Sequence, residues 1–131
     1  MKEIRGDAKN IRALLGGAKF AVDYYQREYR WETKQIAELV EDLSEKFSES
    51  YEDGDERSEV EKYGHYFLGS IIVSDKDGKK YIIDGQQRLT SLTLLLIHLH
   101  RRLADAEQKG QIAELIFSQK FGKRSFNLEV P

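Results

Sequence analysis

The stretch Tyr81–Leu92, which reads YIIDGQQRLTSL, decides how this chain folds. An apolar run typical of a β-strand ends at Asp84 and Gly85, and a leucine-rich helix begins after two glutamines and Arg88. This order points the first amide groups of a helix, with an arginine beside them, at the space above a strand end. A helix N-terminus attracts anions, and an arginine can hold a phosphate through two hydrogen bonds. The stretch therefore predicts an anion site that suits a phosphate.

The rest of the chain predicts the elements that surround this junction. Apolar residues at helical spacing predict helices, and runs rich in isoleucine and aromatic residues predict strands. The expected helices are a short one capped by Asp7 and ending at Leu15, one capped by Thr33 and reaching Phe47, the leucine-rich helix over 89–103, and one over 111–120. The expected strands cover 19–22, 65–74 and 80–83, with a further one beginning at Arg124 and a hairpin turn at Gly78.

These elements predict one α+β domain over residues 1–131, with a small mixed sheet, a β-hairpin and a central leucine-rich helix. Leucines at helical spacing line one side of that helix, and Leu94 with Ile97 fills the other side. We therefore expect this helix to be buried on most of its faces. The helix that begins at Thr33 is expected to pack its one apolar face inward.

Composition narrows the class of protein. The chain has no cysteine, which excludes disulfides and thiolate metal sites, and no apolar run long enough for a bilayer. We expect a cytoplasmic protein with no membrane contact. Residues 49–62 hold seven acids and two bases, so the remainder carries 19 bases against 16 acids. The surrounding segment 48–63 is predicted to be an acidic exposed loop, attached to a mildly basic domain that suits a phosphate-bearing ligand.

Three sequence blocks resemble a known family. Ile83–Thr90 (IDGQQRLT) resembles the signature of the DUF262 family, the N-terminal domain of GmrSD-type, modification-dependent restriction systems and related phage-defence proteins. Val22–Trp31 (VDYYQREYRW) resembles an early segment of that family, although Asp23 stands where proline is usual. Tyr66–Ile72 (YFLGSII) resembles the strand before the signature. The blocks occur in the family's order and span residues from about Phe20 to His100.

The resemblance implies a fold and a function. It implies a fold similar to ParB and sulfiredoxin domains, in which a Gly-x-x-Arg turn at a helix start holds nucleotide phosphates. It also implies that the domain binds a nucleoside triphosphate and has an NTPase activity. We expect Mg²⁺ to accompany the nucleotide. In the family this activity is coupled to DNA cleavage by a C-terminal nuclease domain or subunit, so DNA is contacted through a larger assembly. Family proteins usually continue well past Pro131, and we therefore expect a domain truncated at its C-terminus.

The residues of the signature each have two readings. Asp84 either caps the leucine-rich helix, with Gln87 as its capping-box partner, or holds Mg²⁺ or a water in a catalytic role. Gly85 allows either a tight turn or the close approach of a phosphate. Gln86 and Gln87 are either exposed helix residues or cofactor-binding amides. Arg88 either pairs with Asp84 or binds phosphate and serves catalysis, and the family resemblance favours the phosphate.

A second group of candidate residues is Tyr25, Gln26 and Arg27. Aromatic rings commonly anchor a loop to a core, which could explain Tyr25 without a ligand. Gln26 and Arg27 are harder to explain in that way. We expect Arg27 to face the turn from Asp84 to Arg88 and to contribute to the cofactor site, with Tyr24 or Tyr25 available to stack on a base.

Other chemistries lack their motifs. No Walker A loop, no His-Glu-x-x-His and no histidine–asparagine–histidine nuclease cluster occurs, so nuclease activity is not expected within this chain. His98 and His100 point to different faces of one helix and form no local metal pair. Two other functions stay open: a non-catalytic DNA-binding module, and a structural domain that binds a partner. The sequence leaves the oligomeric state open, a homo-oligomer included.

Overall fold

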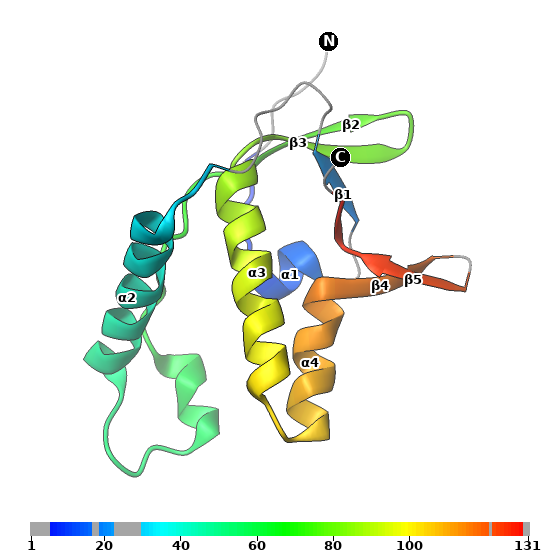
Figure 1. Cartoon of the computed structure of the whole chain (residues 1–131). Helices are drawn as coiled ribbons and strands as arrows, with labels where there is room; N and C mark the ends of the chain where they lie inside the picture. The colour runs from blue at the N-terminus through cyan, green and yellow to red at the C-terminus, as the bar shows by residue number, and fades with distance from the viewer. Residues whose placement is uncertain (1–5, 17–18, 23–29, 121, 130–131) are drawn as a thin grey trace.

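The computed structural model describes residues 6–16, 19–22, 30–120 and 122–129 (Figure 1). The helices are α1 (Ile11–Leu15), α2 (Thr33–Ser50), the 3₁₀-helix η1 (Arg57–Lys62), α3 (Gln86–Arg102) and α4 (Ala106–Ile116). The strands are β1 (Phe20–Val22), β2 (Ile72–Lys76), β3 (Lys79–Asp84), β4 (Phe117–Lys120), β5 (Lys123–Phe126) and β6 (Leu128–Glu129). After α1 and β1, helices and strands follow one another in groups along the chain, which is an α+β arrangement.

A small mixed sheet organises the fold. Its strand order is β2-β3-β1-β6, with β1 parallel to both β3 and β6, while β2 and β3 run antiparallel. The turn between β2 and β3 holds Asp77 at φ 53° and Gly78 at φ 77°, the positive angles that a two-residue hairpin turn requires. A second hairpin joins β4 to β5. The predicted α+β class, mixed sheet and hairpin at Gly78 are therefore confirmed.

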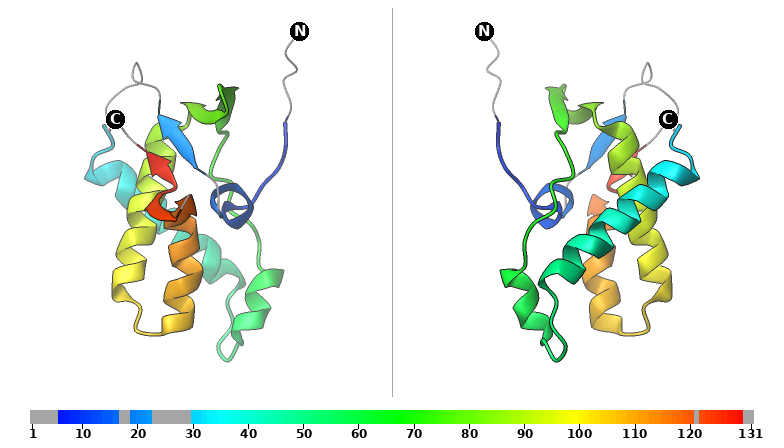
Figure 2. Two further views of the ribbon diagram at one scale, coloured as in Figure 1. Left: turned by 90° about the vertical axis from the view of Figure 1, so that its right-hand side faces the viewer. Right: turned by 90° about the vertical axis from the view of Figure 1, so that its left-hand side faces the viewer.

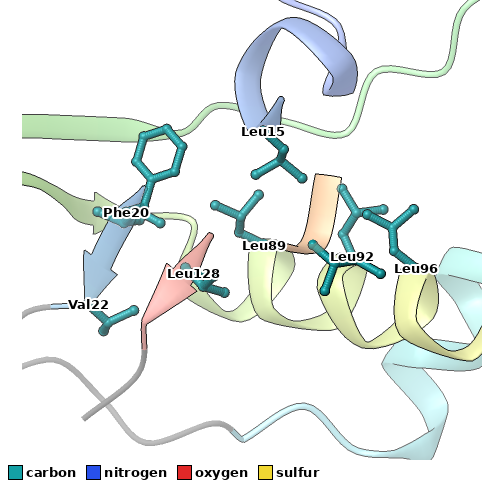
Figure 3. Packing of buried hydrophobic residues seen from close by; sticks show 9 residues of the cluster. Leu15, Phe20, Val22, Leu89, Leu92, Leu96 and Leu128 are labelled. Carbon is teal, nitrogen blue, oxygen red and sulfur yellow. The ribbon is translucent and has the colours of Figure 1, made fainter. Parts of the chain in front are cut away.

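The hydrophobic core lies between this sheet and the α3–α4 pair (Figure 3). Leu89, Leu92 and Leu96 recur on one face of α3 and are buried. Ile82 of β3 is fully buried beneath them. The other buried apolar residues of this cluster are Leu15, Phe20, Val22, Ile116 and Leu128. Because β3 and α3 supply the centre of the core, the junction between them is held in place from both sides.

Two predictions about helix burial hold only in part. Leu94 and Leu99 of α3 are 49% and 41% exposed, so the second half of α3 is buried on one face, whereas no residue from Gln86 to Thr93 is exposed. In α2 only Leu39 is buried, whereas Val40 and Phe47 stay exposed. The reason is the position of α2, which lies obliquely to one side of the antiparallel α3–α4 pair (Figures 1 and 2).

Four predicted boundaries also differ. Helix α1 is capped by Asn10, whose Oδ1 accepts from the amide of Ala13 at 2.8 Å, and not by Asp7. Helix α2 has Glu32 as its N-cap, with Gln35 completing a capping box, and Thr33 is its first helical residue. The strand predicted over 65–74 is shorter and begins at Ile72. The helix predicted over 111–120 begins at Ala106 and ends at Ile116, where β4 takes over.

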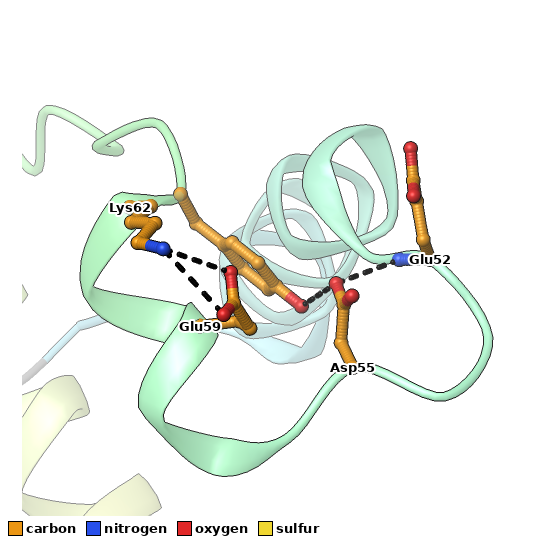
Figure 4. A network of polar contacts seen from close by, with 5 residues as sticks. Glu52, Asp55, Glu59 and Lys62 are labelled. Atoms are coloured by element: carbon orange, nitrogen blue, oxygen red, sulfur yellow. Dashed lines mark hydrogen bonds and ion pairs between the residues drawn. The ribbon is translucent and has the colours of Figure 1, made fainter.

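The acidic segment 48–63 contains the end of α2, a turn and η1, and most of its side chains are exposed. Asp55 organises the turn, because its Oδ2 accepts from the Tyr63 hydroxyl at 2.7 Å and from the Glu52 amide at 3.0 Å (Figure 4). The Tyr63 ring meets Phe47 edge-on, with ring centroids 5.5 Å apart. This network ties η1 back to the end of α2.

The network predicts a pH window. Partial burial of the ring and the bond to Asp55 raise the pKa of Tyr63 to about 12, and the Tyr63 bond holds the pKa of Asp55 below 3.8. The Tyr63 contribution is therefore present below an unfolded-state pKa of about 10 and is lost as pH rises through about 12. The Asp55 contribution is present above pH 3.8 and is lost on acidification.

We expect Tyr63→Phe to speed hydrogen exchange of the Glu52 amide several-fold at neutral pH, with no change in α4. Equal exchange in both proteins would contradict this.

Candidate functional site

The junction of β3 and α3 depends on a glycine. Gly85 has φ 93°, in the left-handed region, and serves as the N-cap of α3. A Cβ added at this position would lie 2.5 Å from the Ile71 Cδ1 atom and 3.2 Å from the Ser70 carbonyl oxygen. Both the backbone angle and the close approach of the segment before β2 therefore require glycine here.

Asp84 does not cap α3. The N-cap residue is Gly85, which has no side chain that could accept from the first-turn amides, so the predicted capping box of Asp84 and Gln87 is wrong. Asp84 is exposed and makes no side-chain hydrogen bond within the described part of the chain. The Gln86 side chain turns back instead and donates to the Ile83 carbonyl at 2.9 Å. The positive end of the α3 dipole thus faces outward beside an exposed carboxylate.

Arg88 is positioned by the segment that precedes β2. Its Nη1 donates to the Ser70 carbonyl at 3.2 Å. Gly69 has φ 116°, and a Cβ there would lie 2.5 Å from the guanidinium carbon of Arg88. The missing side chain of Gly69 therefore makes the space that this guanidinium occupies. Arg88 and Asp84 form no ion pair among the described residues, so the alternative in which they pair is wrong.

A recess of about 310 Å³ opens at this junction. We call it the junction recess, and it is lined by Trp31, Ser70, Asp84, Gly85, Gln86, Gln87 and Arg88. The five residues from Asp84 to Arg88, all predicted as site residues, are thus brought together around one opening. The Gln87 side chain also accepts from the Arg30 amide at 2.6 Å, which joins the segment before α2 to the start of α3.

Tyr25, Gln26 and Arg27 lie outside the described residues, so their predicted roles stay predictions. The residues on both sides of that segment are described. Val22 pairs with Ile82 at the end of β1, and Arg30 is bonded to Gln87.

Sequence reasoning missed three contributors to the site. Ser70 and Trp31 line the junction recess, and Gly69 admits the Arg88 guanidinium. Tyr66 also lies near Arg88. Burial is the larger cause that raises the pKa of Tyr66, and its hydrogen bond of 3.0 Å to Asp42 raises it further. The positive charge of Arg88 opposes this rise. The available signal was Gly69, because a glycine inside a strand-like run often marks the close approach of another group.

Within the described ranges, no group of three or more histidine, cysteine, aspartate or glutamate side chains could hold a metal ion. Asp84 therefore stands as a single carboxylate at the junction recess.

None of the helices in the described part of the chain is long and apolar enough to cross a bilayer.

A comparison with known protein families identifies the family of this chain. Residues 9–129 match the model of one family, the N-terminal domain of the GmrSD restriction endonuclease. The match covers nearly the whole chain, including β3, the start of α3 and the segment that holds Arg88. The chain therefore belongs to the GmrSD N-terminal domain family, also known as DUF262. It is a domain of a restriction endonuclease, which implies a nuclease partner and DNA in the complete assembly. A search of curated proteins gives no match.

Proposed function

We propose that this domain binds a nucleoside triphosphate in the junction recess and acts as the sensor or motor part of a modification-dependent restriction or phage-defence system. The observation that carries this proposal is the placement of Arg88 beside the N-terminal end of α3, at the rim of a recess of about 310 Å³. That volume lies at the lower end of the range for ligand pockets. A helix N-terminus and a guanidinium that face one opening suit a phosphate group.

Each lining residue has a role in this proposal. Arg88 neutralises phosphate charge, and its bond to the Ser70 carbonyl leaves further guanidinium donors for the ligand. Gly85 would let a phosphate approach the backbone, because it places no side chain of its own over the first turn of α3. The amides near Gln86 and Gln87 would cradle that phosphate. The exposed part of Trp31 offers an aromatic wall to a base.

The proposal includes Mg²⁺, for which Asp84 is the protein ligand. Mg²⁺ is usually held by one or two carboxylates together with substrate phosphates and waters, so a single exposed carboxylate fits this ion. When bound, the ion would neutralise charge on the triphosphate. Arg88 and the start of α3 would stabilise negative charge from the other side, since phosphoryl transfer is catalysed mainly by positioning and electrostatics. Hydrolysis is proposed for the complete assembly rather than for this chain alone, with Asp84 either holding the ion or orienting the attacking water.

The proposal extends to the predicted second group and to the fold. Tyr25, Gln26 and Arg27 are proposed to complete the nucleotide site, Arg27 as a second phosphate ligand. The arrangement of a strand, a glycine turn and an arginine in the first turn of a helix supports a likeness to ParB and sulfiredoxin domains. Sulfiredoxin chemistry is excluded, because the chain has no cysteine.

A titration with ATP, GTP and CTP in the presence of Mg²⁺ tests the proposal. We expect saturable heat of binding with at least one nucleotide, and affinity about 10- to 100-fold lower in Arg88→Ala, since a hydrogen bond to a charged group contributes about 1.5–3 kcal/mol. Arg102→Ala is the matched control, because Arg102 is an exposed arginine at the other end of α3, and it should bind as the wild type does. Circular dichroism checks that both variants stay folded.

Two results would count against the proposal. The first is nucleotide affinity that is the same in the wild type and in a folded Arg88→Ala variant. The second is duplex DNA binding that is strongly salt-dependent and indifferent to nucleotide, which indicates a DNA-binding module instead.

A further inference from the structure

A second recess, of about 500 Å³, lies between the C-terminal half of α3 and the β4–β5 hairpin. We call it the hairpin recess, and the lining residues that matter here are Ile97, His100, Arg101, Phe117, Arg124 and Phe126. It shares no lining residue with the junction recess. Arg88 and Arg101 are 13 residues apart on α3, which corresponds to about 20 Å along a helix. The two recesses are therefore separate sites.

The wall of the hairpin recess is aromatic. Phe117 and Phe126 lie across the hairpin from each other, with ring centroids 4.8 Å apart and planes tilted by 35°. Phe126 is 47% exposed, so much of its ring is uncovered. Half-buried Ile97 lies against the core beneath. A planar ring that entered the recess could stack on Phe126 and displace water from apolar surface.

The rim of the hairpin recess is positive. Arg101, Arg124 and His100 line it, and no carboxylate does. The Arg124 guanidinium lies over the Phe117 ring, 4.2 Å from its centroid, which is a cation–π contact. Neither arginine forms an ion pair with any described residue. Two cations without acidic partners beside an apolar wall suit a ligand that combines a ring with negative charge.

The β4–β5 hairpin, which carries Phe117, Arg124 and Phe126, is anchored to the body of the domain. The ammonium group of Lys19 donates to the carbonyls of Ser118 and Ser125, each at 3.1 Å, and to the Ser125 hydroxyl. These bonds cross both strands of the hairpin next to Arg124 and Phe126. The cation and the exposed ring are thus held before any ligand arrives, which lowers the entropy cost of binding.

We infer that the hairpin recess binds a nucleotide unit, its base stacked on Phe126 and its phosphate held by Arg101 and Arg124. The same chemistry is offered by a free nucleotide and by a nucleotide within a single DNA strand. This site acts independently of the triphosphate site proposed above and uses none of its residues.

The test uses the full chain, fluorescein-labelled dT12 and unlabelled dTMP as competitor. We expect dT12 to bind saturably, and Arg101→Glu to weaken that binding by about tenfold or more through loss of a charge-assisted bond and charge repulsion. Arg102→Glu is the matched control: it makes the same charge change at the next exposed residue, which does not line the recess, and it should cost less than about threefold. Phe126→Leu, which keeps the site apolar but removes the ring, should also weaken binding.

The results distinguish a free nucleotide from a DNA strand as the ligand, and they distinguish this site from the proposed triphosphate site. Competition by dTMP supports a free nucleotide unit, and binding of dT12 without such competition supports a strand. Three results would overturn the inference. The first is an equal loss of binding in Arg101→Glu and Arg102→Glu, and the second is no binding of either nucleotide probe. The third is binding of decanoate, an apolar anion without a ring, when neither nucleotide probe binds. Arg88→Ala should leave dT12 binding unchanged. If Arg88→Ala abolishes triphosphate binding while Arg101→Glu changes nothing, the hairpin site fails and the proposed function stands.

Discussion

Replacing Gly85 with alanine should lower the free energy of unfolding by about 2–4 kcal/mol, from the cost of a Cβ in left-handed backbone and from crowding in a packed region. Gly85 has φ 93°, and the new Cβ would meet the Ile71 side chain at 2.5 Å and the Ser70 carbonyl oxygen at 3.2 Å. The Ile71 side chain can move, whereas the Ser70 carbonyl also holds Arg88. Urea denaturation measures the loss, and nucleotide titration should show weaker binding as well.

Gly78→Ala is the matched control for this prediction. Gly78 also has a positive φ, of 77°, but nothing lies within 4 Å of an added Cβ. Its substitution should therefore cost only the backbone term of about 1–2 kcal/mol. The difference between the two variants isolates the close approach of the Ile71 segment to the start of α3. Equal losses in the two variants would mean that this close approach contributes nothing.

Elements whose pattern is local could be predicted from the sequence. The Asp77–Gly78 turn is an example, because a two-residue hairpin needs positive φ at both positions and these residue types tolerate it. The leucine-rich helix is another, since its apolar spacing gives one buried face. Helix ends were less predictable, because several neighbouring side chains compete for the first-turn amides. Asn10 rather than Asp7 caps α1 for this reason.

Elements that depend on distant partners were predicted poorly. The segment 117–120 was predicted as the end of a helix, but it forms β4 because it pairs with Lys123–Phe126. The apolar face of α2 is exposed although its spacing is that of a buried helix, because spacing shows which face is apolar and does not show what will cover it.

The candidate site divides in the same way. The sequence places Asp84, Gly85 and Arg88 within five positions, so their position together at one strand end could be predicted. The direction of the Arg88 side chain could not be predicted, because it depends on the space left by Gly69 and on the Ser70 carbonyl. An arginine at the spacing of an ion pair with Asp84 turns instead to a backbone acceptor 18 residues earlier in the chain.

Asn127→Asp should cost about 3–5 kcal/mol of stability at pH 7, because it places an uncompensated charge in a buried site. Asn127 is 1% exposed, and its amide nitrogen donates to the Leu15 carbonyl at 2.9 Å and the Glu114 carbonyl at 3.0 Å. Its backbone bonds Ile116 and Phe20, so one residue joins α1, α4 and β1. A carboxylate of the same shape would face two carbonyl oxygens and donate to neither.

The pH dependence distinguishes this charge effect from a loss of packing. Burial beside carbonyl oxygens should raise the pKa of the introduced carboxyl above its unfolded value of about 3.9. The stability of Asn127→Asp is then retained below that pH and is lost as pH rises through the folded-state pKa, so its deficit should be smaller at pH 4 than at pH 7. Asn127→Leu, which leaves the two carbonyls without a donor but adds no charge, should cost about 1–3 kcal/mol at both pH values. A deficit in Asn127→Asp that does not change with pH would show that the carboxyl titrates in the folded domain as it does in the unfolded chain. The carboxyl would then be solvated, and the three elements would not be joined through a dry contact.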